Sequence, residues 1–247
     1  MLSIIIPVYN EEKYIRRTLT LLKALSLPHE IIISDDKSTD ATASIAREYT
    51  DKVLIPEHKH PTIGANRNAG ARTAVGEFLV FIDSSCSVEN PDAFFSRALG
   101  HFSANPKLVG LTGKFAVDPD AETWGDRVAY FIFNTTNLIK NNYLHIGESP
   151  GKFQMVRRGA FDEVGGVSER LVTGEDADFF YRLSKIGRTM YDSKLVIYHS
   201  GRRAHAIGWP KLLYIWMVDR FWMTFFGTTQ TKSWDRWWES KEGRKTH

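Results

Sequence analysis

Acidic and aromatic side chains follow short apolar runs near the start of the sequence. Tyr9 and Glu11 come after the first run. Asp35 and Asp36 come after the second, and Asp83 comes after the fourth. If these runs are parallel strands, such residues gather beyond the strand ends, where ligands of open α/β sheets bind. Carboxylates and an aromatic ring at one rim suit the base and ribose of a nucleotide.

The phosphates of a nucleotide would need a partner other than a glycine-rich loop. The sequence contains neither Gly-x-Gly-x-x-Gly nor a Walker loop, so it predicts no backbone cradle. The phosphate charge then requires a metal ion or arginines. Arg67 follows Gly64 at the start of a predicted helix, where backbone N–H groups also favour anions.

A second acidic group opens a predicted helix at residues 176–186. Glu175, Asp176 and Asp178 stand at its start. Carboxylates there stabilise the helix terminus by interacting with its dipole. A carboxylate within reach of a hydroxyl group could instead act as a general base. The residues alone leave both interpretations open.

Strand and helix patterns alternate through the first 110 residues, which predicts a parallel sheet covered by helices on both faces. Asn10 is expected to cap the first helix. The later half is less regular, with an aromatic segment from Trp209 onward. The predicted strands are residues 3–7, 30–34, 52–55, 77–82, 108–112, 154–157 and 194–198.

Length and composition are those of one α/β domain with a short appendage. The chain has 247 residues, 43% hydrophobic and 25% charged, which excludes wholesale disorder and a multi-span membrane protein. A net charge of +3 does not indicate a nucleic-acid partner. The single cysteine, Cys86, excludes an internal disulfide and is compatible with the cytoplasm. No targeting peptide is predicted.

Six segments together resemble glycosyltransferase family 2, which has the GT-A fold. The resemblance extends over about residues 1–200 and implies a mostly parallel central sheet flanked by helices. The segments, in family order, are residues 3–11 (SIIIPVYNE), 35–40 (DDKSTD), 64–70 (GANRNAG), 76–83 (GEFLVFID), 158–166 (RGAFDEVGG) and 173–178 (TGEDAD).

The resemblance implies a role for each matching residue. Asp176 would be the general base. Asp35 would contact a pyrimidine edge, and Arg67 would lie near the base or phosphates. Asp83 would reach the ribose or the metal-bound diphosphate. The implied set for binding the nucleotide-sugar is Pro7, Tyr9, Glu11, Asp35, Arg67, Asp83, Ser84, Ser85 and Glu175.

The implied reaction is inverting transfer of one sugar from a nucleotide-sugar, expected to be a UDP-sugar, to a hydroxyl group. The acceptor would be a glycan or a lipid-linked precursor. The segment at residues 154–158 lacks the tryptophan of processive synthases, so polymer synthesis is not expected. Rival functions are a sugar nucleotidyltransferase, which would need a glycine-rich loop after the first strand, and a non-catalytic nucleotide-sugar-binding protein.

The sequence departs from the family at its metal motif. The usual Asp-x-Asp reads Asp83-Ser84-Ser85, so a neutral hydroxyl replaces the second carboxylate. Serine is a weaker ligand for Mg²⁺ or Mn²⁺. We expect weak, donor-dependent metal binding by Asp83 and His199. Alternatively, Arg202 and Arg203 neutralise the leaving group without a metal.

The C-terminal part is rich in tryptophan. Residues 209–238 hold six of the seven tryptophans. This extension, residues 206–247, either packs on the acceptor side or lies at a membrane interface, where tryptophan and basic residues are favoured. The preceding domain, residues 1–205, divides into a nucleotide-sugar half (1–110) and an acceptor half (111–205). We expect a cytoplasmic protein, with peripheral membrane contact if the second interpretation holds. His58 and His60 are interpreted as surface residues.

Overall fold

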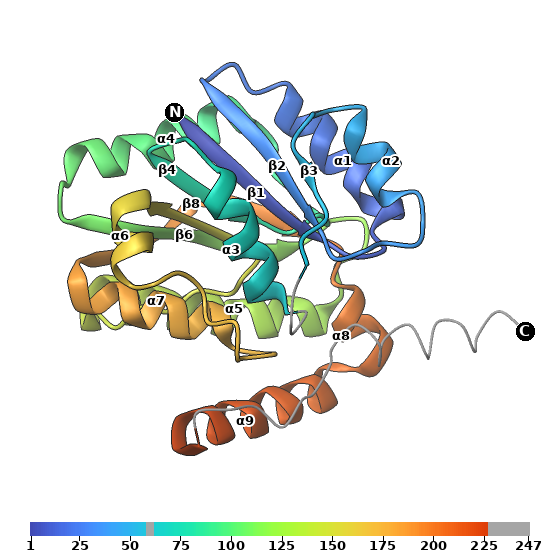
Figure 1. Ribbon diagram of the computed structural model, residues 1–247. Helices are drawn as coiled ribbons and strands as arrows, with labels where there is room; N and C mark the ends of the chain where they lie inside the picture. The colour runs from blue at the N-terminus through green and yellow to red at the C-terminus, as the bar shows by residue number, and fades with distance from the viewer. Residues whose placement is uncertain (58–61, 227–247) are drawn as a thin grey trace, which may run out of the picture.

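The computed structural model describes residues 1–57 and 62–226. Its centre is an eight-stranded sheet in the order β3-β2-β1-β4-β7-β6-β8-β5 (Figure 1). The strands are β1 (Leu2–Val8), β2 (His29–Asp35), β3 (Val53–Leu54), β4 (Phe78–Ile82), β5 (Cys86–Ser87), β6 (Leu108–Val117), β7 (Phe153–Arg157) and β8 (Arg188–His199). The helices are α1 (Glu12–Lys23), α2 (Thr42–Arg47), α3 (Ile63–Thr73), α4 (Pro91–Ala104), α5 (Trp124–Leu138), α6 (Arg158–Glu163), α7 (Glu175–Ile186), α8 (Arg202–Ile207) and α9 (Trp209–Phe226), with a π-helical segment η1 (Ile139–Leu144) after α5.

Strand β1 is buried along its whole length because helices cover both faces of the sheet. Its side chains alternate between two hydrophobic clusters, as the period of a strand requires. Ile4 and Ile6 pack in the cluster that includes residues of α1, α2 and α4. Ile5 packs in the opposite cluster, with residues of α3, α6 and α7. Figure 1 shows these three helices in front of the sheet. The predicted α/β sheet flanked by helices is thus confirmed.

Parallel pairing aligns the ends of the strands that carry the acidic residues. Val8 of β1 lies opposite Asp35 of β2, and Ile5 lies opposite Phe81 of β4. The segments that follow β1, β2 and β4 therefore emerge at one edge of the sheet. Asn10 does not cap α1 as predicted: it adopts a positive φ of 51°, and its side chain accepts a hydrogen bond from Thr39 N–H.

The sheet is mostly parallel, as the family resemblance implies, but three strand pairs are antiparallel. Strand β7 runs antiparallel to both β4 and β6, and β5 runs antiparallel to β8. Because β7 is reversed, its first residue, Phe153, pairs with the last residue of β4, Ile82. The segment before β7 consequently arrives at the same edge as Asp83, and Asp83 N–H donates to the Lys152 carbonyl at 3.2 Å.

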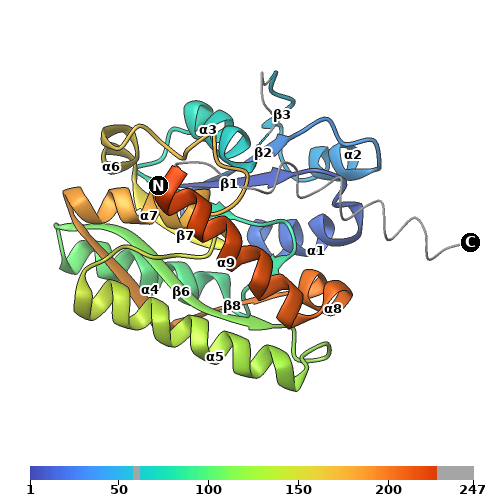
Figure 2. The same cartoon turned by 90° about the horizontal axis from the view of Figure 1, so that it is seen from below.

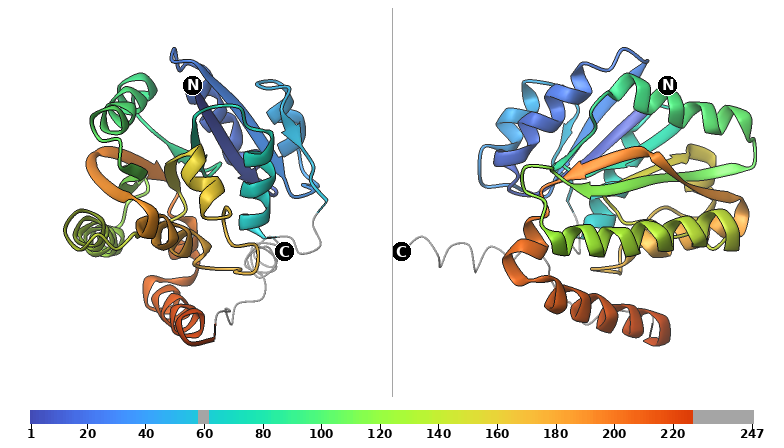
Figure 3. Two further views of the ribbon diagram at one scale, coloured as in Figure 1. Left: turned by 60° about the vertical axis from the view of Figure 1, so that its left-hand side comes forward. Right: turned by 180° about the vertical axis from the view of Figure 1, so that it is seen from behind.

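Two long helices that were not fully anticipated complete the molecule. Helix α5 begins with a capping box formed by Thr123 and Asp126, and it packs along β6 and β8 (Figure 3). Helix α9 crosses the underside of the molecule, where Figure 2 shows it in front of the strand ends. Trp209 and Trp216 of α9 pack against Phe133 of α5 with tilted rings, whose centroids lie 6.0 and 5.7 Å from that of Phe133.

Part of the C-terminal extension lies outside the described residues. The last three tryptophans and the basic residues after Gly227 are outside the described residues. His58 and His60, which were predicted to be surface residues, are also outside them. In the described part of the chain, no helix combines the length and hydropathy that crossing a bilayer requires.

Candidate functional site

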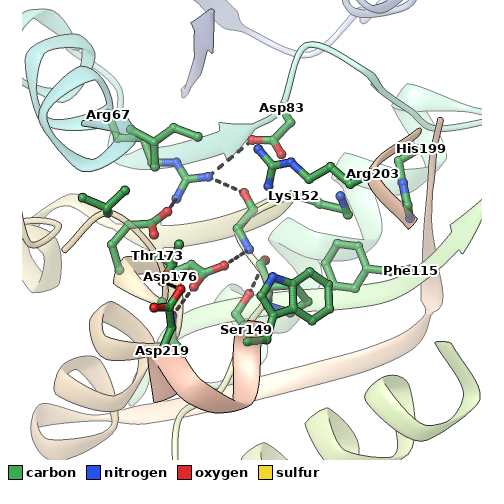
Figure 4. Close-up of a pocket in the computed structure, with 18 of the residues that line it drawn as sticks. Arg67, Asp83, Phe115, Ser149, Lys152, Thr173, Asp176, His199, Arg203 and Asp219 are labelled. Carbon is green, nitrogen blue, oxygen red and sulfur yellow. Dashed lines mark hydrogen bonds and ion pairs between the residues drawn. The ribbon is translucent and has the colours of Figure 1, made fainter. Parts of the chain in front are cut away.

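A cavity of about 1640 Å³ opens where the strand ends meet α9. Its walls come from the ends of β1, β4 and β8, from the starts of β7 and α7, and from the inner side of α9. Figure 4 shows how several of these side chains converge. Of the residues predicted for the site, the cavity is lined by Tyr9, Arg67, Asp83, Ser85, Glu175, Asp176 and His199, with Arg202 and Arg203.

The other predicted residues are buried and do not line this cavity. Pro7 belongs to β1, and Ser84 is buried next to Asp83. Asp35 accepts hydrogen bonds from the backbone N–H and the hydroxyl of Ser38, at 2.9 and 2.6 Å. Its second oxygen is buried and has no partner in the part of the chain that the structure describes. Glu11 forms a two-pronged ion pair with Arg202, whose Nη1 lies 3.0 Å from Oε2.

Arg67 connects three segments of the site through hydrogen bonds of its guanidinium group. It stands in the middle of α3, where its side chain is only 1% exposed. Its guanidinium donates to Glu175 at 3.2 Å and to Asp83 at 3.3 Å. It also donates to the Gly151 carbonyl at 2.7 Å. One arginine therefore fixes the end of β4, the approach to β7 and the start of α7.

Glu175 and Asp176 are adjacent carboxylates at the start of α7. Burial raises the pKa of Glu175 to about 8, with a further upward contribution from Asp176 and an opposing one from Arg67. Burial also raises the pKa of Asp176, while Arg67 acts to lower it. A carboxylate with a raised pKa is better suited to accept a proton near neutral pH.

Backbone N–H groups orient the Asp176 carboxylate. Its Oδ2 accepts from Gly151 N–H at 2.5 Å and its Oδ1 accepts from Ala177 N–H at 2.8 Å. The second of these bonds satisfies a free N–H of the first turn of α7, so the two interpretations of Asp176 are compatible. Asp178 instead pairs with Arg182 at 2.8 Å and does not line the cavity.

His199 lines the cavity in a form that does not suit a metal ligand. Gly201 N–H donates to its Nδ1 at 3.0 Å. Burial lowers the pKa of His199 to about 2, so the ring is neutral. A neutral ring that accepts at Nδ1 carries its proton on Nε2, which then offers no lone pair to a cation. Nε2 is buried and has no hydrogen-bond partner among the described residues.

The residues present do not fit the metal site that the family resemblance implies. With His199 protonated on Nε2, only Asp83 and the Ser85 hydroxyl remain, and Asp83 already pairs with Arg67. Within residues 1–57 and 62–226, no three His, Cys, Asp or Glu side chains are grouped closely enough to hold a metal ion. A divalent cation prefers several carboxylate oxygens.

Lys152 is a site residue that the sequence did not indicate. It lines the cavity near Asp83 and His199 (Figure 4). Burial lowers the pKa of its ammonium group, with Asp83 acting in the opposite direction. The signal that could have found it is the antiparallel pairing of β7 with β4, because that pairing alone brings residue 152 next to residue 83.

Comparisons with known proteins agree with this architecture. The sequence profile described as "Glycosyl transferase family 2" matches residues 3–165. TarS of Staphylococcus aureus, a poly(ribitol-phosphate) β-N-acetylglucosaminyltransferase, is 37% identical over 171 residues, which are 59% of this chain and 29% of TarS. Glycosyltransferase AglE of Haloferax volcanii is 26% identical over 235 residues, which are 88% of this chain and 75% of AglE.

Two solved structures share the fold. TarS residues 1–349 in complex with UDP-GlcNAc superpose with a TM-score of 0.63 at 24% identity, covering 80% of this chain and 57% of that one. The mannosyltransferase PcManGT of Pyrobaculum calidifontis, in complex with GDP-Man and Mn²⁺, gives 0.61 at 16% identity, covering 81% and 56%. These likenesses show the fold, which is that of GT-A glycosyltransferases. The aligned region covers less than a third of the length of TarS.

Proposed function

The chain belongs to glycosyltransferase family 2 and is a glycosyltransferase, and from this premise we propose that it transfers one sugar, with inversion, from a UDP-sugar to a hydroxyl acceptor. The observation that carries the proposal is Asp176, an oriented carboxylate with a raised pKa that lines the large cavity at the strand ends. The choice of UDP draws on TarS, whose solved complex contains UDP-GlcNAc.

In the proposed reaction, Asp176 accepts the proton of the acceptor hydroxyl as its oxygen attacks the anomeric carbon. The new glycosidic bond forms as the bond from the anomeric carbon to the diphosphate oxygen breaks. The leaving nucleoside diphosphate takes the bonding electron pair. Because the attack comes from the side opposite the leaving group, the anomeric configuration inverts. A positioned base contributes about 10²–10⁴-fold to such a step.

The donor pocket is proposed at the ends of β1, β2 and β4. Tyr9 and Asp36 line the cavity there, and Asp83 stands at the end of β4. Tyr9 would contact the base, and Asp83 the ribose. Three buried residues, Pro7, Asp35 and Glu11, would support the pocket without contacting the donor. Glu11 would do so by positioning Arg202 through their ion pair.

The acceptor is proposed to be a lipid-linked or cell-surface glycan precursor that approaches past α9. The inner side of α9 lines the cavity through Trp209, Trp216 and Met223. Its outer side exposes apolar side chains. Five of these are Leu213, Tyr214, Met217, Phe221 and Phe225. Such a face beside the site entrance suits peripheral contact with the cytoplasmic surface of a membrane.

Donor binding tests the proposal directly. We would titrate the full chain with UDP, GDP, CDP and dTDP and with their common sugar conjugates, measuring heat and thermal shift. Binding of a UDP-sugar, followed by release of UDP with an acceptor glycan, is expected. Tyr9→Ala should then weaken binding of UDP. If no nucleotide binds, or if Asp176→Asn turns over at the wild-type rate, the proposed function is wrong.

A further inference from the structure

The cationic side chains that line the cavity include Arg67, Lys152, Arg202 and Arg203. Two of these side chains form ion pairs with carboxylates of the protein. Arg67 pairs with Glu175 and Asp83, and Arg202 pairs with Glu11. By contrast, none of the ion pairs in residues 1–57 and 62–226 includes Lys152, and the Asp83 carboxylate acts on its ammonium group through electrostatic attraction.

The backbone of Lys152 is held next to the Asp83-Ser84-Ser85 segment, in which serine replaces the second carboxylate of the family's Asp-x-Asp motif. Its carbonyl accepts the Asp83 N–H at 3.2 Å, so its backbone is anchored directly beside the remaining aspartate. Its side chain lines the cavity, as His199 does (Figure 4), and Ser85 lines the same cavity. The preceding residue, Gly151, donates to Asp176 and accepts from Arg67, which fixes the same turn from the other side.

We propose that Lys152 binds the diphosphate of the donor and stabilises its departure, taking the place of the divalent metal ion of the family. The proposal rests on the proposed transfer from a nucleotide-sugar. As the bond from the anomeric carbon to the diphosphate oxygen breaks, the electron pair and its negative charge stay on that oxygen. The Lys152 ammonium group donates hydrogen bonds to the diphosphate oxygens and keeps its proton, so the step needs no further reactant.

His199 fits the same arrangement as a donor. Its Nε2–H is buried without a partner in the described part of the chain. A protonated Nε2 can donate a hydrogen bond to an anion. It cannot bind a cation, because the proton occupies the position of the lone pair that a cation would need. The replacement of a carboxylate by Ser85 removes negative charge from this wall, and Lys152 adds positive charge to it. All three features favour a bound anion without a metal.

The experiment compares nucleoside diphosphates with nucleosides in chelator. UDP and uridine would be titrated calorimetrically into the full chain with EDTA or with Mn²⁺; if another nucleoside diphosphate binds more tightly, it and its nucleoside are used. Lys152→Met is expected to weaken binding of the diphosphate about 10- to 100-fold, since a hydrogen bond to a charged group is lost. Binding of the nucleoside should not change. EDTA should leave the wild-type affinity within about twofold.

Controls separate a local effect from loss of folding. Lys152→Arg should retain most of the affinity, and Lys194→Met, a change at an exposed lysine of β8, should have no effect. Thermal unfolding without ligand should show that Lys152→Met is folded. Equal affinity of wild type and Lys152→Met for the diphosphate would overturn the inference, as would loss of wild-type affinity in EDTA. If the wild type binds no nucleoside diphosphate under any condition, the proposed function itself fails, and the inference falls with it.

Discussion

Asp176 Oδ2 accepts a hydrogen bond from the backbone N–H of Gly151 at 2.5 Å. This bond joins the start of α7 to the turn before β7, and the next residue of that turn is Lys152. A side chain at residue 151 would displace the Arg67 guanidinium, because a Cβ atom there would lie 2.6 Å from Arg67 Nη2 and 3.0 Å from Asp176 Oδ2. The proposed base and the proposed diphosphate ligand are therefore positioned by one glycine.

Replacing Asp176 by asparagine tests the proposed base. Asp176→Asn keeps the size of the side chain but cannot accept a proton from the acceptor hydroxyl. We expect kcat to fall by about 10²–10⁴-fold while UDP affinity changes little. Steady-state rates of UDP release and calorimetry of UDP binding measure the two effects. Asp178→Asn is the matched control, because Asp178 pairs with Arg182 away from the cavity; an equal loss in both variants would argue against a special role for Asp176.

Arg67 should matter for stability more than any surface arginine. Arg67→Met removes the partner of Glu175 and Asp83 and leaves the Gly151 carbonyl without its donor. Each buried acceptor left without its donor costs about 1–3 kcal/mol in free energy of unfolding. Urea denaturation would measure the change. Arg72→Met, on the same helix but exposed, should shift the free energy by about 0.5 kcal/mol or less. A small effect at both positions would contradict this account of Arg67.

The raised pKa of Glu175 predicts a pH dependence of stability. Its folded-state pKa is about 8, against an ordinary value of 4.5, because the carboxyl is buried. Between these values the folded protein holds a proton that the unfolded chain has released. The free energy of unfolding contributed by this group therefore falls as pH rises from about 5 to about 8.

Glu175→Gln removes this contribution because glutamine does not ionise. The variant should lose less stability than the wild type over the same pH range, measured by urea denaturation at several pH values. Glu163→Gln serves as the control, because Glu163 is exposed at the end of α6. Parallel curves for the wild type and Glu175→Gln would show that Glu175 is ionised in the folded protein throughout.

The first part of the fold and much of the site follow from local pattern. Short continuous apolar runs predicted β1, β2 and β4, and their parallel pairing places the segments that follow them at one edge of the sheet. Lys152 could not be predicted in this way. Its place depends on the reversal of β7, which is a long-range pairing that no residue near position 152 encodes.

Helix α5 was missed for a different reason. Its apolar residues Trp124, Val128 and Phe131 recur at helical spacing but point to solvent, with Phe131 72% exposed. The residues that attach α5 to the molecule include polar ones: Asn134 bonds to the backbone of Phe115, and Asp126 is fully buried. A search for an apolar face directed at a core does not find such a helix.

The exposed apolar faces of α5 and α9 predict membrane association. On α9, Leu213, Met217 and Phe221 recur every four residues and so share one face of the helix. We expect the full chain to sediment with vesicles of phosphatidylethanolamine and phosphatidylglycerol. Burying an apolar side chain contributes about 1.5–3 kcal/mol, so Met217→Ser with Phe221→Ser should weaken partitioning at least about tenfold.

The control for this surface is an exposed apolar residue at the opposite end of the sheet. Val75 precedes β4 at the edge away from the cavity, and its side chain is 67% exposed. Val75→Ser should leave sedimentation unchanged, because a peripheral membrane surface acts only through the face that meets the bilayer. If the double variant on α9 sediments as well as the wild type, the membrane contact must be made by α5 or by residues after 226. A wild-type chain that never sediments with such vesicles would instead assign the outer face of α9 to another partner.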